Sequence, residues 1–175
     1  MAGAAFNVRE EGRGSRVQDY WPLIALIGVS ALGGYAIATG YDTFTMRSFM
    51  HAFMGVFLCF FALLKIFNPV AFKRGFTMYD LLARRFKPYA FVYPFLELGL
   101  GLAYLSFWNP TVTYAATIVL FSFGTLGVIS ALRRGLDIDC PCMGSILSVP
   151  LSTVTLTEDL AMVVMAAILL IQVSG

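Results

Sequence analysis

Cys140 and Cys142 lie one residue apart, in a short polar segment between two long apolar stretches. A Cys-x-Cys pair can bind Cu(I) or another soft metal ion through two thiolates. It can also close into a small strained disulfide, which is easily reduced. Pro141 fixes its own φ and has no amide donor, so it restricts the loop in both cases. Because Asp137 and Asp139 disfavour a nearby thiolate, we expect slow thiol redox cycling or metal holding rather than a strongly activated nucleophile.

A second set of soft side chains lies in the stretch before residue 67. At 100° per residue, His51 and Met54 fall on one helical face, and Met50 borders it. In the metal hypothesis, a soft metal ion would bind first at these side chains and would then pass to the cysteine pair. For His51 alone, a hydrogen-bonded histidine beside ordinary core methionines is the favoured alternative. The ligands of the metal hypothesis are Cys140, Cys142, Met143, His51, Met50 and Met54.

Glu97 is the most telling ionisable residue, because it lies about nine residues into an expected membrane span. An unpaired carboxylate at that depth is costly, so it must be protonated, paired or facing a polar cavity. We expect Lys65 or His51 as its partner, and a structural ion pair and a proton site both remain open. Cys59 lies inside a span, where a lone cysteine is most often a small packing residue.

The composition places the chain in a membrane. Of its 175 residues, 59% are hydrophobic and 13% are charged, and the mean hydropathy is +0.80. Soluble domains average about a quarter charged residues. The net charge of +2 is too small to suggest a nucleic-acid partner, so the lipid bilayer is the expected environment.

Apolar stretches predict an all-α membrane protein with five spans and one interfacial helix. Ser30, Gly34 and Ala38 form a row of small residues in the first span, which predicts close packing against another helix. Basic and apolar residues mix at helical spacing over 70–87, which predicts one amphipathic helix on the bilayer surface. The expected spans are 21–39, 47–67, 89–108, 111–132 and a last one that ends near 173.

The start of the last span is ambiguous. The apolar run from Leu160 covers about 21 Å of helix, less than the roughly 30 Å of a bilayer core. We therefore favour a start near Leu151, although a capping box from Thr155 to Glu158 would start the helix later. For Glu158 and Asp159 we lean slightly towards an anionic cap of the helix N-terminus. The alternative is an intramembrane acidic pair.

The predicted organisation is a polar tail (1–19), an extra N-terminal membrane helix and turn (20–45), and a four-helix membrane domain (46–175). With five spans, all of the 12 basic residues except Arg47 fall on the side of the N-terminus. The positive-inside rule makes that side cytoplasmic. The Cys-Pro-Cys segment is then expected in the cytoplasm as well.

Three motifs of this chain resemble motifs of a known protein family. They are Leu-Leu-Lys ending at Lys65, Tyr-Pro-x-x-Glu-Leu through Glu97, and Cys-Pro-Cys-Met-Gly from Cys140. Over roughly residues 46–173, the chain resembles the MauE/DoxX-like redox-associated membrane proteins. The resemblance implies a DoxX-like four-helix bundle in a bacterial inner membrane and a role for Lys65, Glu97, Cys140 and Cys142.

MauE-type proteins are linked to maturation of methylamine dehydrogenase, and DoxX-type proteins to quinone and sulfur-compound redox. The sequence from Cys140 to Leu160 is similar to a branch fused to a heavy-metal-associated domain. Because the N-terminal tail has no Cys-x-x-Cys, we expect any metal hand-off to need a separate protein.

Three functional hypotheses follow. The first is a redox accessory protein in which Cys140 and Cys142 cycle, with Lys65 and Glu97 as an intramembrane polar pair and a thioredoxin-like partner. The second is a component that binds or transports Cu(I) or another soft metal together with a metal-binding partner. The third is a structural subunit of a larger membrane complex.

Overall fold

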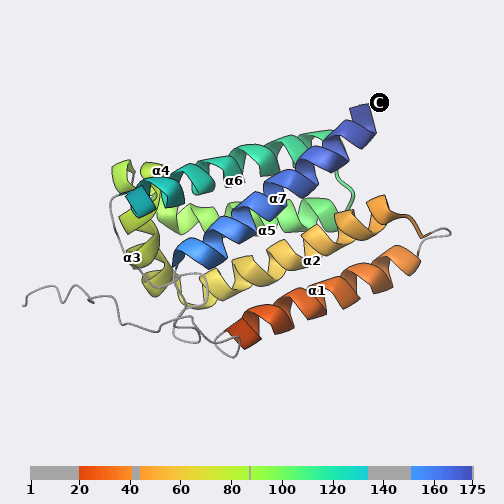
Figure 1. Ribbon diagram of the computed structural model, residues 1–175, viewed down its shortest axis with the longest axis horizontal. Coiled ribbons are helices and arrows are strands. Elements are labelled where there is room, and N and C mark those ends of the chain that lie inside the picture. The colour runs from red at the N-terminus through yellow and green to blue at the C-terminus, as the bar shows by residue number, and fades with distance from the viewer. Residues whose placement is uncertain (1–19, 41–43, 87, 134–150, 175) are drawn as a thin grey trace, which may run out of the picture.

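The computed structural model describes residues 20–40, 44–86, 88–133 and 151–174, and every regular element in them is helical (Figure 1). The predicted all-α membrane fold is therefore confirmed. The long helices lie side by side, with α1 on the outer side of α2 and the short helices α3 and α4 at one end. The elements are α1 (Trp21–Thr39), α2 (Met46–Phe67), α3 (Pro69–Tyr79), α4 (Leu81–Arg85), α5 (Tyr89–Leu105), α6 (Pro110–Arg133) and α7 (Leu151–Ser174).

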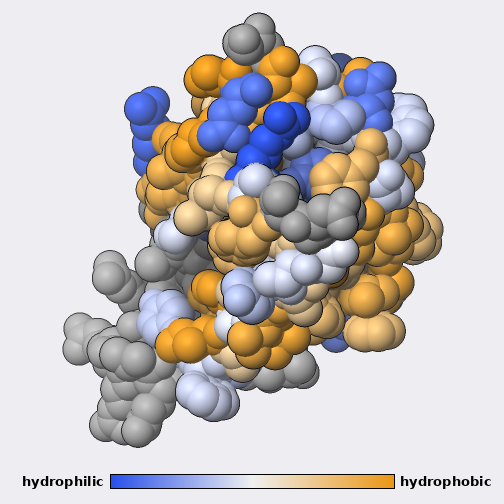
Figure 2. All heavy atoms as spheres, turned by 90° about the vertical axis from the view of Figure 1, so that its right-hand side faces the viewer, coloured by the Kyte–Doolittle hydropathy of each residue, from blue (hydrophilic) through white to orange (hydrophobic). Residues whose placement is uncertain are grey.

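Among the described residues, four helices are long and apolar enough to cross a membrane: α1, α2, α6 and the Thr155–Val173 part of α7. The third expected span is the 17-residue helix α5, which is apolar but shorter. It extends over about 26 Å. Figure 2 looks onto the end where α2 begins, and hydrophobic residues surround a hydrophilic area in the upper middle of that end.

The small-residue row of α1 packs against α2, as the sequence predicted. Ser30, Gly34 and Ala38 are the buried residues of α1. A Cβ placed on Gly34 would lie 2.8 Å from the backbone N and Cα of Phe53. The two backbones can approach this closely because position 34 has no side chain.

Local signals explain where α2 begins and ends. Thr45 caps the helix, because its side chain accepts from the backbone N–H of Ser48 and the Ser48 hydroxyl accepts from the backbone N–H of Thr45. The helix ends at Phe67, just before Asn68 and Pro69, where an extended residue is preferred before proline.

The single amphipathic helix predicted over 70–87 is wrong in two respects. Asp80 divides it into α3 and α4, because its carboxylate accepts from the backbone N–H groups of Leu82 (2.9 Å) and Ala83 (2.7 Å). Burial raises the pKa of Asp80, and these two backbone donors offset only part of that rise. Phe72 and Phe76 of α3 are buried in the core. The segment therefore closes one end of the bundle instead of only resting on the bilayer.

The last helix begins at Leu151, so the favoured early start is confirmed. The expected cap is wrong: Thr155, Glu158 and Asp159 are buried within α7, and its first turn has no acidic residue. Both carboxylates lie about two turns into the helix.

We predict that Gly34→Ala destabilises the protein by about 1–3 kcal/mol, because the new methyl group would collide with the backbone of Phe53. Gly28→Ala is the matched control, since a Cβ there meets no atom within 4 Å. Both changes replace glycine by alanine and therefore gain the same helix propensity. The difference between their free energies of unfolding then measures the packing of α1 on α2. Unfolding by titration with SDS measures it, and equal stabilities would contradict the packing of α1 on α2.

Candidate functional site

A cluster of buried ionisable side chains lies inside the bundle, towards the end that carries α3 and α4. The Nζ of Lys65 on α2 is 2.5 Å from Oε2 of Glu97 on α5 and 4.0 Å from Oε1 of Glu158 on α7. The exposed fractions of the three side chains are 3%, 0% and 4%. Three helices that are distant in sequence thus meet at one ammonium group. We call Lys65, Glu97 and Glu158 the charged cluster.

Aromatic rings surround this ammonium group. The Nζ of Lys65 lies 5.8 Å from the ring centre of Phe61, 5.9 Å from that of Phe72 and 5.4 Å from that of Tyr93. Aromatic faces attract cations at such distances. Because Phe72 belongs to α3, the short helix contributes to the lining of the cluster.

The helical periodicity of α5 places Glu97 on the face that points into the bundle. It belongs to a stripe of buried positions with spacings of three and four residues, which is the pattern of a helix face that points to the core. The same reasoning holds for Lys65, which follows the buried Phe61 by four residues. The buried stripe of α5 consists of Ala90, Tyr93, Pro94, Glu97, Gly101 and Tyr104.

Two glycines make room for polar side chains near the cluster. A Cβ on Gly124 of α6 would lie 2.7 Å from Oδ2 of Asp159, which is 3% exposed. A Cβ on Gly101 of α5 would lie 2.8 Å from Sγ of Cys59. Cys59 therefore packs where α2 and α5 approach each other, in the packing role expected for it.

His51 does not join the cluster. It lies 14 residues before Lys65 on the same helix, about 21 Å away along the axis. Its Nδ1 is 2.8 Å from the hydroxyl of Tyr114, and its ring stacks on Phe107 at 4.2 Å between centres. His51 is buried and held at the opposite end of the bundle, so Lys65 alone of the two expected partners pairs with Glu97.

The described part of the predicted metal site is buried, and the metal hypothesis stays a prediction. Met54 is fully buried in the hydrophobic core, and Met50 packs against that core. The Nδ1 of His51 already has a partner in Tyr114. Within residues 20–40, 44–86, 88–133 and 151–174, no three His, Cys, Asp or Glu side chains converge to hold a metal ion. The other predicted ligands, Cys140, Cys142 and Met143, lie outside the described residues.

The chain reaches the cysteine segment from the end of the bundle that holds the charged cluster. Helix α6 ends at Arg133 and α7 begins at Leu151, both at the end that carries α3 and α4 (Figure 1). Glu158 follows the start of α7 by seven residues, or about 10 Å. The described structure therefore connects the charged cluster to the flank of the Cys-Pro-Cys segment through one continuous helix.

Sequence reasoning missed two partners. For Glu158 the sequence left a helix cap and an intramembrane acidic pair open, with a slight preference for the cap, and it did not name Glu158 as a partner of Lys65. Tyr114 was not singled out, because a tyrosine in an apolar span gives no sign of the histidine that it meets.

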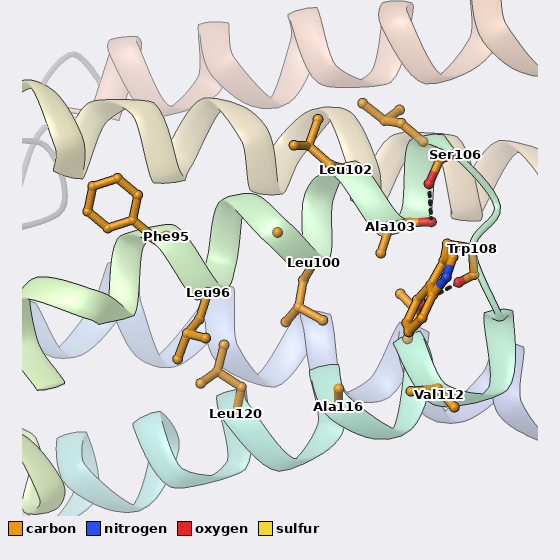
Figure 3. Close-up of a pocket in the computed structure, with 13 residues that line it drawn as sticks. Phe95, Leu96, Leu100, Leu102, Ala103, Ser106, Trp108, Val112, Ala116 and Leu120 are labelled. Atoms are coloured by element: carbon orange, nitrogen blue, oxygen red, sulfur yellow. Dashed lines mark hydrogen bonds between the residues drawn. The ribbon is translucent and has the colours of Figure 1, made fainter.

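A groove of about 830 Å³ lies between α5 and α6, away from the charged cluster (Figure 3). Apolar side chains such as Leu96, Leu100 and Leu120 line it. Its hydroxyl groups are satisfied locally: Ser106 donates to the carbonyl of Ala103, and Thr113 donates to the carbonyl of Trp108. The groove is thus largely apolar, and these two hydroxyl groups are bonded to backbone carbonyls of the same region.

The family of methylamine utilisation protein MauE matches residues 23–172 of this chain. The chain belongs to the MauE family. The match takes in most of α1, all of α2 to α6 and most of α7, and it contains the whole charged cluster. No curated protein and no solved structure matches the chain.

We predict that Lys65→Met destabilises this MauE-family protein by about 3–5 kcal/mol, because it leaves the buried carboxylate of Glu97 without its cation. Lys65→Met combined with Glu97→Leu should recover part of that loss, since Glu97 no longer places a charge there and Glu158 is the one carboxylate of the charged cluster that remains. A double-mutant cycle with unfolding in SDS measures the coupling.

The control is Lys73→Met on the exposed side of α3, which should change stability by no more than about 0.5 kcal/mol. If the losses in free energy of unfolding of Lys65→Met and Glu97→Leu simply add in the double variant, the two side chains do not stabilise each other.

Proposed function

We propose that this protein is a membrane accessory protein in methylamine utilisation whose Cys140–Cys142 pair exchanges disulfides with a partner protein. The observation that carries the proposal is the buried charged cluster of Lys65, Glu97 and Glu158, joined through α7 to the flank of the cysteine segment. Intramembrane ionisable residues are costly and are usually kept for function. The matching family description supports the methylamine utilisation context.

The exchange needs no cofactor. One thiolate of the pair attacks a disulfide of the partner, and the partner's S–S bond breaks as a mixed disulfide forms. The second cysteine then attacks that mixed disulfide, which closes the Cys140–Cys142 disulfide. The partner leaves with two thiols, so two electrons and two protons pass from the pair to the partner. The reverse sequence reduces the pair, and a thioredoxin-like protein has the chemistry for either direction.

The charged cluster would support this exchange by holding a proton inside the bundle, near the start of α7. The ammonium of Lys65 has two carboxylates within reach, at 2.5 Å and 4.0 Å. When it moves towards Glu158, the carboxylate of Glu97 loses its partner and gains affinity for a proton. Proton uptake and release could then accompany thiol chemistry without moving charge through the apolar core.

The cysteine pair is proposed to face the cytoplasm. Exposed basic residues gather on α3, α4 and the end of α6, and Arg47 lies at the opposite end. Cytoplasmic loops carry such an excess of Lys and Arg. Among the described residues, the exposed basic side chains at this end are those of Lys73, Arg74, Arg84, Arg85 and Arg133.

The redox state of the pair can be tested by thiol trapping in cells. We expect wild-type protein to shift between reduced and oxidised forms with the cellular redox state. Cys140→Ser or Cys142→Ser should abolish the shift, and one of them should accumulate a mixed disulfide with the partner. Cys59→Ala is the matched control and should leave the shift unchanged. A pair that stays fully reduced under every condition would contradict the exchange and favour a structural subunit.

The orientation has its own test in a Cys59→Ala background. A thiol reagent that cannot cross membranes should label Cys140 and Cys142 in inverted vesicles and leave them unlabelled in right-side-out vesicles. The positive-inside rule gives this expectation. Labelling in right-side-out vesicles would overturn the orientation while leaving the disulfide exchange open to the trapping experiment.

A further inference from the structure

Positive charge gathers on the surface of the bundle end that carries α3 and α4, where α6 also ends (Figure 1). Every acidic side chain in the described part of the chain is buried. Among the described residues, the charge exposed at this end is therefore positive only. We call its carriers the basic face, which consists of Lys73, Arg74, Arg84, Arg85 and Arg133.

The inner face of α3 fixes the direction in which its two cations point. Phe72 and Phe76 are buried, and their ring centres lie 6.1 Å and 4.6 Å from that of Tyr93 on α5. At 100° per residue, Lys73 and Arg74 turn away from these rings, and both are exposed. Neither cation lies in the last turn of α3, so balancing the helix dipole does not explain them.

The length of α2 places the basic face at the level of the lipid headgroups. This helix has 22 residues and extends over about 33 Å, slightly more than the roughly 30 Å of a bilayer core. It ends at Phe67, and α3 begins two residues later, where the chain leaves the hydrocarbon layer.

Large apolar side chains are exposed beside the cations of the basic face. Met78 of α3 is 54% exposed, Leu82 of α4 is 48% exposed, and Phe86, which follows α4, is 58% exposed. Basic side chains mixed with apolar ones are typical of a segment that lies in the interfacial layer of a bilayer. The nearest negative groups in that layer are those of acidic phospholipids.

We propose that the basic face binds the headgroups of acidic phospholipids in the bilayer leaflet at this end of the bundle. Phosphate oxygens accept hydrogen bonds from ammonium and guanidinium groups. The neighbouring apolar side chains insert between the lipids. Clusters of basic residues directly beside membrane helices select acidic lipids in this way. The inference requires neither the cysteine pair nor the proposed disulfide exchange.

The test uses purified full-length protein in nanodiscs of phosphatidylcholine and a phosphatidylglycerol probe with a photoreactive group near its headgroup. Labelled peptides are mapped by mass spectrometry, and we expect label on α3 and α4. Unlabelled phosphatidylglycerol should displace the probe about tenfold better than phosphatidylethanolamine, because each basic side chain near an anionic surface contributes on the order of a fivefold gain in affinity. Equal displacement by the two lipids would overturn the selection of an acidic headgroup.

Variants test whether the cations of α3 carry this preference. Lys73→Gln combined with Arg74→Gln should reduce the preference for phosphatidylglycerol to about twofold. Lys73→Arg combined with Arg74→Lys should retain it, because the charge is kept. Arg47→Gln is the matched control, since it removes an exposed cation at the opposite end of the bundle and should leave the preference unchanged. A full preference in the double glutamine variant would overturn the proposed site.

Two comparisons distinguish the lipid from other anions. If inorganic phosphate displaces the probe more strongly than potassium chloride at equal ionic strength, a free phosphate is the ligand and the lipid is overturned. If the double glutamine variant loses a cross-linked acidic protein in cells but keeps its lipid preference in nanodiscs, the basic face binds that protein instead. Melting temperatures of all variants are measured in parallel, so that a lost preference in a folded protein is distinguished from unfolding.

Discussion

The salt bridge between Lys65 and Glu97 is the constraint on which the rest of the bundle depends. Neither charge can remain alone at this depth, so α2 and α5 must present them to each other. Glu158 brings α7 to the same ammonium group, and Phe72 brings α3 over it. A buried ion pair contributes little net stability compared with apolar packing, but breaking it is expensive. The pair therefore selects one arrangement of these helices over alternatives that would satisfy the apolar surface equally well.

The two polar sites of α2 are separated by an apolar layer. His51 is held by Tyr114 at one end, and Lys65 by Glu97 near the other. Between them on the buried face of α2 lie Met54, Leu58 and Phe61, all fully buried. The described side chains thus form no chain of polar groups from one end of α2 to the other. The charged cluster lies towards the end of the bundle where α6 ends and α7 begins, and the contact between His51 and Tyr114 lies at the opposite end.

The sequence predicted helices and their faces better than it predicted partners. Long apolar stretches predicted the long helices. The row of Ser30, Gly34 and Ala38 identified the packed face of α1, because small residues at helical spacing let another helix approach closely. Glu97 stood out because an intramembrane carboxylate is costly wherever it is. Periodicity gives the face of a helix, however, and not the helix that it meets. The contact of Glu158 with Lys65 and that of Tyr114 with His51 were therefore missed. The break at Asp80 depends on two backbone N–H groups that the sequence does not reveal.

Glu158 ties the first turns of α7 to the charged cluster. It lies seven residues after Leu151, and its carboxylate is the second one within 4.0 Å of the Lys65 ammonium group. A shift of α7 along the bundle would change that distance, and with it the share of the positive charge that remains for Glu97. The position of α7 and the charge balance of the buried pair therefore depend on each other, so a change at the start of this helix is expected to reach the interior of the bundle.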